Sequence, residues 1–351
     1  MMFWTKTATF GLLLASAASA FTVTHTSPTF RSRALSATED KDAVVSEETE
    51  KIVETFNLEA YISSHIPALE EAMLAAVKST VPQTDNICKS MEYSLMAGGK
   101  RIRPMLAIAA CEMFGGSATE AMPTAVALEM IHTMSLIHDD LPMMDNDDLR
   151  RGKPTNHIVF GEQVAILAGD ALLSISFETV AKKTPKSVAA KKVLDVIGRM
   201  GTAVGQIGLA GGQVMDLECE AKDDVTLEDL TWIHTHKTAT LLQVAICSGA
   251  IIGGATEEEV KSLETFALDI GLAFQIADDI LDVTASTEDL GKTAAKDLDS
   301  DKTTYPKILG LEESKVEAQR LIDEAKALMK PFGDRAIPLL AMADFIVDRK
   351  N

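Results

Sequence analysis

Two aspartate-rich clusters, far apart in the chain, each end an apolar segment whose composition favours helix. The first runs from Asp139 to Asp145 (DDLPMMD) and the second from Asp278 to Asp282 (DDILD). Magnesium ions take oxygen ligands and are usually held by one or two carboxylates together with substrate phosphates. Two such clusters that face each other across an apolar interior predict a magnesium-dependent site for a diphosphate. Taken singly, an acidic run is more often a solvated surface or a helix cap.

The spacing within each cluster predicts how its carboxylates are oriented. Asp278 and Asp282 are four positions apart and share one face of a helix. Asp139 and Asp145 are six positions apart, so an uninterrupted helix would point them about 120° away from each other. Pro142 lies between them and removes a helical hydrogen bond. We therefore expect the helix to end or bulge near Pro142 and Asp145 to return towards Asp139.

From about Leu58 onward the sequence has a helical pattern with few interruptions. Ala, Leu, Met, Ile and Glu dominate, and neither a long alternating strand pattern nor an Asn-Gly hairpin signal is present. Glycine pairs are the expected breaks and threonines the expected helix caps: Gly98–Gly99, Gly115–Gly116, Gly253–Gly254, Thr226 and Thr256. The expected fold is all-α, a single-domain bundle of about ten or more helices around a central apolar cavity.

The amino-terminal residues have the pattern of a targeting segment rather than of part of the fold. Residues 1–20 fit a signal peptide, with Lys6 before an apolar run that is too short to span a bilayer. Residues 21–38 lack acidic residues and resemble a transit peptide, and residues 39–54 are expected to form an acidic mobile arm before a catalytic domain at 55–351. This two-part leader favours a plastid of secondary origin in an alga. Secretion is the alternative, although the 4 cysteines lack the paired spacing of secreted disulfide proteins.

The net charge of the chain argues against a nucleic-acid partner. The formal net charge is −19, so a nucleic-acid surface is not expected, and no segment is predicted to span a membrane. An anionic substrate would then need a local basic pocket or metal ions. The candidate cations stand beside glycine-rich or acidic motifs: Lys100, Arg101, Arg103, Arg150, Arg151, Lys237, Lys292 and Lys302. Solvated lysines and local salt bridges are the alternative interpretation of each.

Six segments together resemble one enzyme family. They are GGKRIRP at 98–104, EMIHTMSLIHDDLPMMDNDDLRRGKPTNH at 129–157, GEQVAILAGDALL at 161–173, HTHKTATLL at 234–242, FQIADDILD at 274–282 and LGKTAAKDLDSDKTTYP at 290–306. With these segments the chain resembles the trans-isoprenyl diphosphate synthases, most closely the geranylgeranyl diphosphate synthases of plants and plastids. The resemblance covers residues 58–351 and implies the isoprenoid synthase fold.

The resemblance implies metal ligands among the aspartates. Asp139 and Asp145 would hold two Mg²⁺ ions and Asp278 a third, so that three ions are expected in the site, and Mn²⁺ could replace them. The remaining aspartates would complete the motifs, often through metal-bound water: Asp140, Asp279 and Asp282.

The resemblance also implies two groups of substrate-binding residues. Those for the allylic diphosphate are Arg150, Lys237, Thr238, Gln275, Lys292 and Lys302, and those for isopentenyl diphosphate are Lys100, Arg103, His132 and Arg151. His132 is seven positions before Asp139 and so lies on about the same helical face. Its place beside the site therefore has geometric support as well.

The implied reaction is a prenyl transfer by ionisation, condensation and elimination. Isopentenyl diphosphate would be joined to dimethylallyl, geranyl or farnesyl diphosphate, and a homodimer is expected from the family. The expected product is the twenty-carbon geranylgeranyl diphosphate, because none of the residues expected to line the tunnel below the first motif is aromatic: Met134, Ser135 and Ile131. The place of Met134 in the tunnel wall is implied by the resemblance alone. Farnesyl or longer-chain synthases are the main alternative. A non-catalytic synthase subunit and a terpene cyclase are less favoured, because the chain keeps both aspartate motifs and GGKRIRP.

Overall fold

The computed structural model describes Val53 and residues 55–220, 222, 224–284 and 303–347. Every described residue belongs to one compact unit, Ala43–Asn351. The predicted signal peptide and transit segment therefore lie outside the described residues, as do Lys292, Lys302 and nearly all of the predicted acidic arm. What was expected of them stays a prediction.

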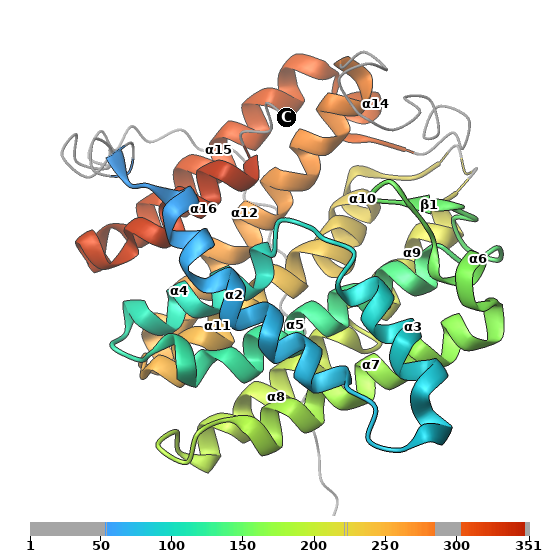
Figure 1. The fold of residues 1–351 in the computed structure, drawn as a ribbon. Helices are drawn as coiled ribbons and strands as arrows, with labels where there is room; N and C mark the ends of the chain where they lie inside the picture. The colour runs from blue at the N-terminus through green and yellow to red at the C-terminus, as the bar shows by residue number, and fades with distance from the viewer. Residues whose placement is uncertain (1–52, 54, 221, 223, 285–302, 348–351) are drawn as a thin grey trace, which may run out of the picture. The chain divides into compact units, whose positions relative to one another are not determined.

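The described part of this unit consists of helices and one short hairpin (Figure 1). The longer helices are α2 (Leu58–Val77), α3 (Asp85–Leu95), α4 (Ile102–Met113), α5 (Ala118–Asp139), α7 (Glu162–Lys183), α8 (Ala190–Val204), α9 (Leu209–Cys219), α11 (Thr240–Gly253), α12 (Glu257–Thr284), α15 (Leu311–Met329) and α16 (Ile337–Val347). The shorter elements are η1 (Pro82–Thr84), α6 (Asn156–Phe160), α10 (Leu227–Ile233), the π-helix η2 (His234–Ala239), α14 (Tyr305–Leu309) and η3 (Lys330–Ala336). Strands β1 (Leu149–Arg150) and β2 (Lys153–Pro154) pair antiparallel. The all-α prediction is confirmed.

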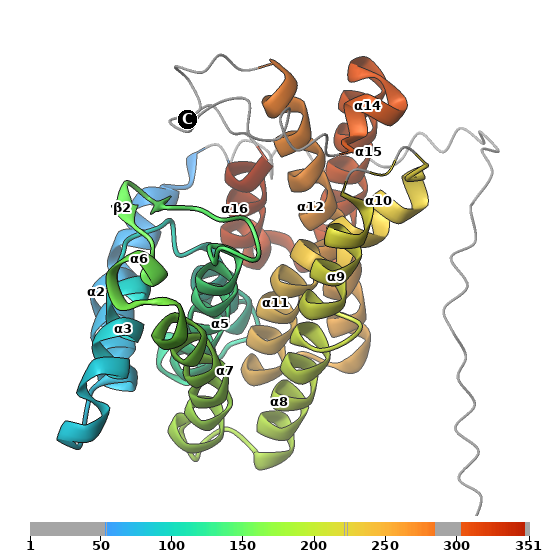
Figure 2. The ribbon, with the colours of Figure 1, turned by 90° about the vertical axis from the view of Figure 1, so that its right-hand side faces the viewer.

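The central helices are α4, α5, α11 and α12. α11 packs against α4 and α12, and α5 packs against α4 and α7 (Figures 1 and 2). Every residue from Val244 to Ile252 of α11 is buried, so this helix is apolar around its whole circumference, as a core helix must be. The long helix α12, which carries the second aspartate motif, is covered on its other side by α15.

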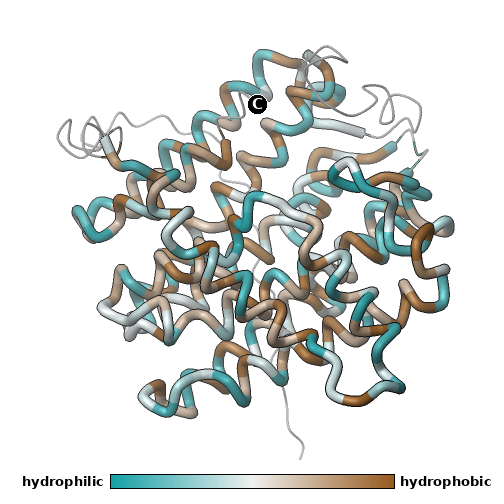
Figure 3. Tube along the Cα trace, viewed as in Figure 1, coloured by the Kyte–Doolittle hydropathy of each residue, from teal (hydrophilic) through white to brown (hydrophobic). Residues whose placement is uncertain are grey.

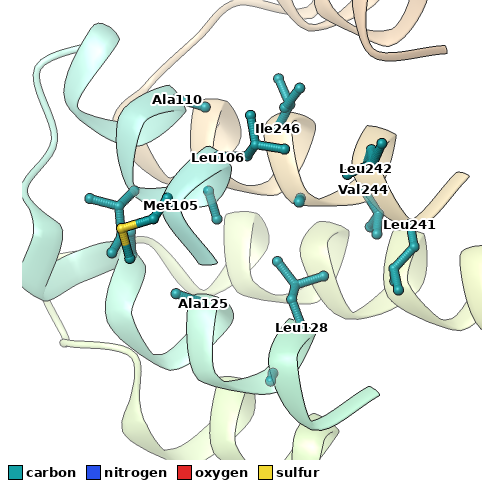
Figure 4. Close-up of a cluster of buried hydrophobic side chains, with 14 of the residues drawn as sticks. Met105, Leu106, Ala110, Ala125, Leu128, Leu241, Leu242, Val244 and Ile246 are labelled. Atoms are coloured by element: carbon teal, nitrogen blue, oxygen red, sulfur yellow. The ribbon is translucent and has the colours of Figure 1, made fainter. Parts of the chain in front are cut away.

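The main core lies where α4, α5 and α11 meet. Figure 4 shows side chains of all three helices pointing towards one another, among them Met105, Leu106, Leu128 and Ile246. These four are at most 2% exposed, and burying such a side chain stabilises the fold by about 1.5–3 kcal/mol each. Gly249 allows the close contact between α11 and α4, because a Cβ there would lie 2.0 Å from the backbone oxygen of Ala107.

The outer helices are amphipathic and capped where the sequence predicts. Figure 3 shows hydrophobic and hydrophilic residues alternating along α15, and its buried residues recur every three or four positions, from Ser314 to Met329. Thr226 caps α10 in a capping box with Asp229, and the hydroxyl of Thr256 accepts a hydrogen bond from the Glu259 amide. The predicted glycine breaks also separate helices: Gly98–Gly99 between α3 and α4, Gly115–Gly116 between α4 and α5, and Gly253–Gly254 between α11 and α12.

Among the described helices, α7 is the one whose length and hydropathy would allow it to cross a membrane. Its most apolar window has a mean hydropathy of 1.6 and is 33% buried. A core helix meets the same two criteria, so this is weak evidence for a membrane span. In the fold α7 packs against α5 and α3.

Candidate active site

The first aspartate motif folds back on itself at the end of α5. The helix ends at Asp139, and the Asp145 amide then donates a 2.8 Å hydrogen bond to the Asp139 carbonyl oxygen. Pro142 lies in the intervening turn, where it cannot continue the helix. The predicted helix end and the return of Asp145 towards Asp139 are confirmed. Two carboxylates that would diverge on a continuous helix are thereby brought to one end of α5.

The Asp139 carboxyl lies in an environment that favours its neutral form when no cation is bound. Burial raises its pKa to about 6, and Asp145 and Asp140 add to the rise, while Lys237 and Arg150 oppose it. A divalent cation supplies the positive charge that such a carboxylate lacks. The first motif is therefore electrostatically suited to a metal ion.

The Asp140 carboxyl forms a partly buried ion pair with Arg150. Its Oδ1 accepts hydrogen bonds from Nε of Arg150 at 2.9 Å and from Nη2 of the same guanidinium at 2.5 Å. Burial raises the pKa of Asp140, and Arg150 opposes that rise. A second carboxylate, that of Asp147, lies 3.5 Å from Arg150. Arg150 is thus fixed by two acidic side chains of the same segment, which is the local salt-bridge alternative that the sequence left open.

The hairpin that carries Arg150 and Arg151 is attached to α3. The Tyr93 hydroxyl donates a 2.7 Å hydrogen bond to the Pro154 carbonyl oxygen. Asn156, just after β2, is 2% exposed and donates to the Ser90 carbonyl and to the Ser94 hydroxyl. Because α3 is itself packed on α7, these bonds hold the two arginines beside the first motif.

A group of cations forms around the start of α4. Burial lowers the pKa of Arg103 to about 10, an effect that Glu129 opposes and Arg151 strengthens. The buried Nε of Arg103 has no hydrogen-bond partner among the described residues. Burial and the neighbouring arginines, Arg103 first, also lower the pKa of His132 well below its usual value, so this imidazole is neutral. An orphaned guanidinium N–H beside other cations suits an anionic ligand with several oxygens.

Two further residues of this group are held by other parts of the fold. The Arg151 guanidinium donates to the Gly98 carbonyl oxygen, and the Lys100 ammonium lies 4.8 Å from the centre of the Phe345 ring of α16. The structure therefore brings Arg103, His132 and Arg151 to the region where the hairpin, α4 and α5 meet, while the Lys100 side chain lies against α16 at the start of α4.

Lys237 faces the first motif from the π-helix η2. Its ammonium pairs with the Asp216 carboxylate of α9 at 2.5 Å, and its charge lowers the pKa of Asp139. Gly212 allows α9 to come this close, because a Cβ there would lie 2.4 Å from the Lys237 amide nitrogen. One turn before Asp216, both amide atoms of Gln213 are buried without a partner among the described residues. This face of α9 therefore has polar atoms that a ligand could satisfy.

The three aspartates of the second motif lie in three different environments on α12. Asp278 is half-buried, Asp282 is exposed, and Asp279 is 8% exposed. Asp279 accepts hydrogen bonds from His234 and from the backbone of Tyr305. Gln275 lies three positions before Asp278 on the same helix, and Thr238 follows Lys237 on η2. The spacing of the motif did not predict that Asp279 would differ from its neighbours in burial and hydrogen bonding.

The carboxylates of the two motifs suit a magnesium ion whose coordination is completed by the substrate. Within the described ranges, no three His, Cys, Asp or Glu side chains converge closely enough to hold a metal ion by themselves. Mg²⁺ is usually bound by one or two carboxylates together with substrate phosphates and water. Asp139 and Asp145 at one end of α5, with Asp278 on α12, fit that pattern, so the protein would contribute part of the coordination and a diphosphate the rest.

The residues expected to set product length lie in the core. Ile131 and Met134 are 0% and 7% exposed and belong to the main hydrophobic cluster, and the Ser135 hydroxyl bonds back to the His132 carbonyl oxygen. A small cavity beside the first motif, between α3, α5 and the hairpin, has a volume of about 30 Å³, which is room for roughly one water molecule. The elongation tunnel stays a prediction.

Sequence reasoning did not identify three residues that shape the site. Asp216 binds Lys237, Glu129 binds Arg101, and Asn156 anchors the hairpin. Asp216 and Glu129 are acidic residues inside helical patterns, where solvation is the usual expectation. Asn156 lies within the segment 129–157, which carries part of the family resemblance, but its three hydrogen bonds to α3 depend on the tertiary fold.

The acidic end of α5, opposed by cations from the hairpin, α4 and η2, is an arrangement suited to an anionic ligand bound together with metal ions. Comparison with known proteins gives the particular family: the chain belongs to the polyprenyl synthetase family, whose model matches residues 84–332.

Relatives and a solved structure agree with that assignment. The chain is 52% identical over 297 residues to a dimethylallyltranstransferase of Fischerella ambigua, with 85% of each chain covered. It is 53% identical over 298 residues to a chloroplastic geranylgeranyl pyrophosphate synthase of Catharanthus roseus, with 85% of this chain and 83% of the relative covered. Among solved structures, an FPP/GFPP synthase from Zymomonas mobilis in its apo form is similar, with a TM-score of 0.75, 34% identity, and 83% of this chain and 99% of that chain covered.

Proposed function

We propose that the protein is a magnesium-dependent prenyltransferase that joins isopentenyl diphosphate to dimethylallyl, geranyl and farnesyl diphosphates and makes geranylgeranyl diphosphate. One observation carries the proposal: Asp139 and Asp145 come together at the end of α5, beside Lys237 and Arg150. The names of the relatives, a dimethylallyltranstransferase and a geranylgeranyl pyrophosphate synthase, support the reaction and its product.

The allylic diphosphate would bind between the two aspartate motifs. Bound Mg²⁺ would neutralise its charge and so improve it as a leaving group. Lys237 and Arg150 would contact the same diphosphate, together with Lys292 and Lys302, and the buried apolar side of α5 would keep water away from the allylic cation. Asp139, Asp145 and Asp278 would supply the carboxylate ligands for three Mg²⁺ ions.

Isopentenyl diphosphate would bind without metal at the cations around α4. Arg103, with its orphaned Nε, and Lys100 and Arg151 would hold the diphosphate, and the neutral His132 would donate one hydrogen bond to it. The C–O bond of the allylic diphosphate would break first, giving an allylic cation and free diphosphate. The double bond of isopentenyl diphosphate would then attack that cation and form one C–C bond. Loss of a proton to the released diphosphate completes the reaction.

Turnover tests the proposal directly. The full chain, given Mg²⁺, isopentenyl diphosphate and farnesyl diphosphate, should release pyrophosphate, and excess chelator should stop the release. Asp139→Ala should lower kcat at least a thousandfold, whereas Asp334→Asn, an exposed aspartate of η3, should change it less than twofold. Equal rates for the two variants would contradict the proposed role of the first motif, and no turnover by the wild-type chain would favour a non-catalytic subunit.

A homodimer is the assembly that we propose, because α7 leaves an apolar face uncovered. Only 33% of its apolar window is buried, and Leu167 is 55% exposed, near Ile158 and Val159 of α6, which are 53% and 46% exposed. Such a face is a typical protein–protein contact surface. Light scattering should give twice the mass of the chain, and Leu167→Asp should shift it towards the monomer; a wild-type monomer would contradict the proposal.

The proposed location is a plastid, of secondary origin in an alga, where the product could serve as a carotenoid precursor. The leader pattern of residues 1–38 and the chloroplastic relative support it. Residues 1–38 fused to a fluorescent protein should direct it to the plastid of an alga with secondary plastids. Release of the fusion into the medium would instead support secretion.

A further inference from the structure

We propose that Asp279 is a positioning residue: it holds His234, and through it the π-helix η2, so that Lys237 points at the first aspartate motif. Asp279 would thus serve the allylic-diphosphate side of the site without binding metal. The inference rests on the proposed function for the role of Lys237, while the contact between Asp279 and His234 is independent of it.

The Asp279 carboxylate is already engaged within the protein. Its Oδ2 accepts a 3.2 Å hydrogen bond from Nε2 of His234 and a 2.8 Å hydrogen bond from the Tyr305 amide. Asp279 is 8% exposed and His234 9%. Successive helical residues point about 100° apart, so Asp279 faces η2 and α14 rather than the direction taken by the half-buried Asp278.

The same contact is reinforced by aromatic packing. The rings of His234 and Tyr305 are stacked, with centroids 5.7 Å apart and planes at 14°. The Tyr305 hydroxyl lies 2.7 Å from the Thr231 hydroxyl of α10. His234 is therefore fixed by a hydrogen bond at its ring nitrogen and by stacking on its face, and its rotation would break both.

The π-helix is attached to α12 at its two ends. His234 begins it and is held by Asp279, while Ala239 ends it and lies against Gly271, where an added Cβ would be 2.4 Å from the Ala239 Cβ. A π-helix is a rare conformation that must be stabilised by its surroundings. Lys237 lies between these two attachments and reaches Asp216 at 2.5 Å. Loss of the Asp279–His234 bond would free the half of η2 that precedes Lys237.

Paired substitutions at His234 and His236 test the contact. His234→Gln keeps an N–H donor and His234→Met keeps only the bulk. His236 belongs to the same π-helix, but its ring bonds to the Trp232 carbonyl oxygen and stacks on that exposed indole, so His236→Met is the matched control. The probe is a non-ionisable thio-analogue of farnesyl diphosphate, bound by the full chain at saturating Mg²⁺ and measured by calorimetry.

We expect His234→Met to weaken binding of the analogue about tenfold, His234→Gln about twofold and His236→Met less than twofold. The KM for isopentenyl diphosphate should stay within twofold in all three, which a general loss of structure would not produce. Asp279→Asn keeps an acceptor oxygen for both bonds, so it should bind the analogue within twofold of the wild-type chain, and the Mg²⁺ concentration for half-maximal binding should also stay within twofold. Asp278→Asn should raise that concentration at least tenfold.

Two results would overturn the inference. In the first, Asp279→Asn raises the Mg²⁺ concentration for half-maximal binding as much as Asp278→Asn does, while His234→Met leaves the affinity for the analogue unchanged. That result would make Asp279 a metal ligand. In the second, His234→Met weakens binding of the analogue and raises the KM for isopentenyl diphosphate by the same factor. That result would show that the contact only supports the fold. If the wild-type chain binds the analogue yet forms no product, the proposed function fails while the positioning role is still measured; if it binds no analogue, both fail.

Discussion

The Glu129 carboxylate lies 2.6 Å from Nη1 of Arg101, and both side chains are 2% exposed. Arg101 has a left-handed backbone, with φ of 52°, at the residue before α4, and its Nη2 also donates to the Leu95 carbonyl oxygen. Arg101 therefore connects the end of α3 to the middle of α5. Glu129 is the acidic side chain that opposes the burial effect on the Arg103 and Arg151 pKa values, so one buried carboxylate stabilises several cations of the site.

Removal of the Glu129 charge should destabilise the fold strongly. Glu129→Gln would leave the buried Arg101 without a counter-charge, and loss of one partner of a buried pair costs about 3–5 kcal/mol. The double variant Arg101→Met/Glu129→Met should recover most of that free energy of unfolding. Urea unfolding measures both. A loss below about 1 kcal/mol in Glu129→Gln would contradict the importance given to this pair.

The space between α9 and η2 should be intolerant of even one methyl group. In Gly212→Ala the new Cβ would lie 2.4 Å from the Lys237 amide nitrogen and 2.7 Å from its Cα, so α9 or η2 must move and Lys237 with it. We expect kcat to fall more than tenfold, equivalent to about 1.4 kcal/mol in the barrier. Gly201→Ala in α8, where nothing lies within 4 Å, should keep full activity and gain about 0.5–1 kcal/mol of stability. Similar kinetics in both variants would show that the tight contact does not position Lys237.

The hairpin should depend on its attachment to α3. Asn156→Ala removes the donor to the Ser90 carbonyl and the acceptor of the Ser90 hydroxyl, a 2.8 Å bond, and leaves buried polar groups unpaired at a cost of about 1–3 kcal/mol. Because Arg151 is carried by this hairpin, the KM for isopentenyl diphosphate should rise severalfold as well. Tyr93→Phe, which removes only the bond to Pro154, should give a smaller change in the same direction. An unchanged KM in Asn156→Ala would separate the hairpin from substrate binding.

A half-buried carboxyl in α12, that of Asp269, should make stability depend on pH. Burial raises the pKa of Asp269 from 3.8 to about 7, Glu324 and Glu317 of α15 add to the rise, and Arg320 opposes it. The folded chain thus keeps a proton on Asp269 that the unfolded chain loses above pH 3.8. The stability contributed by this group is therefore present at pH 4, falls as the pH rises, and is lost by about pH 7.

Asp269→Asn should therefore be more stable than the wild-type chain at pH 8 and about equal to it at pH 4. Discounted for its partial exposure, the gain at pH 8 should be about 1 kcal/mol, or roughly 2–4 °C in Tm. Asp334→Asn, at an exposed position, should show no such trend. If Asp269→Asn and the wild-type chain differ in stability by the same amount at pH 4 and pH 8, the pKa assigned to Asp269 is contradicted.

The sequence could predict features that depend on neighbouring residues. Pro142 alone indicated that α5 would end and return Asp145 to Asp139, and Thr226 and Thr256 indicated where helices begin. Features that need two distant segments could not be predicted. The pairs Arg101–Glu129 and Lys237–Asp216 join different helices, and the direction of Asp279 depends on where η2 and α14 pack. Periodicity indicates which face is buried but not which polar residue lies opposite.

The central claim is tested most directly by the length of the product. The full chain would be incubated with Mg²⁺, isopentenyl diphosphate and dimethylallyl diphosphate, and the dephosphorylated products separated by chromatography against standards. We predict mainly geranylgeraniol from the wild-type chain and a shorter product from Met134→Phe, because an aromatic ring would fill space at a position that is 7% exposed in the core of α5. Farnesol or a longer polyprenol as the main wild-type product would contradict the proposed twenty-carbon product.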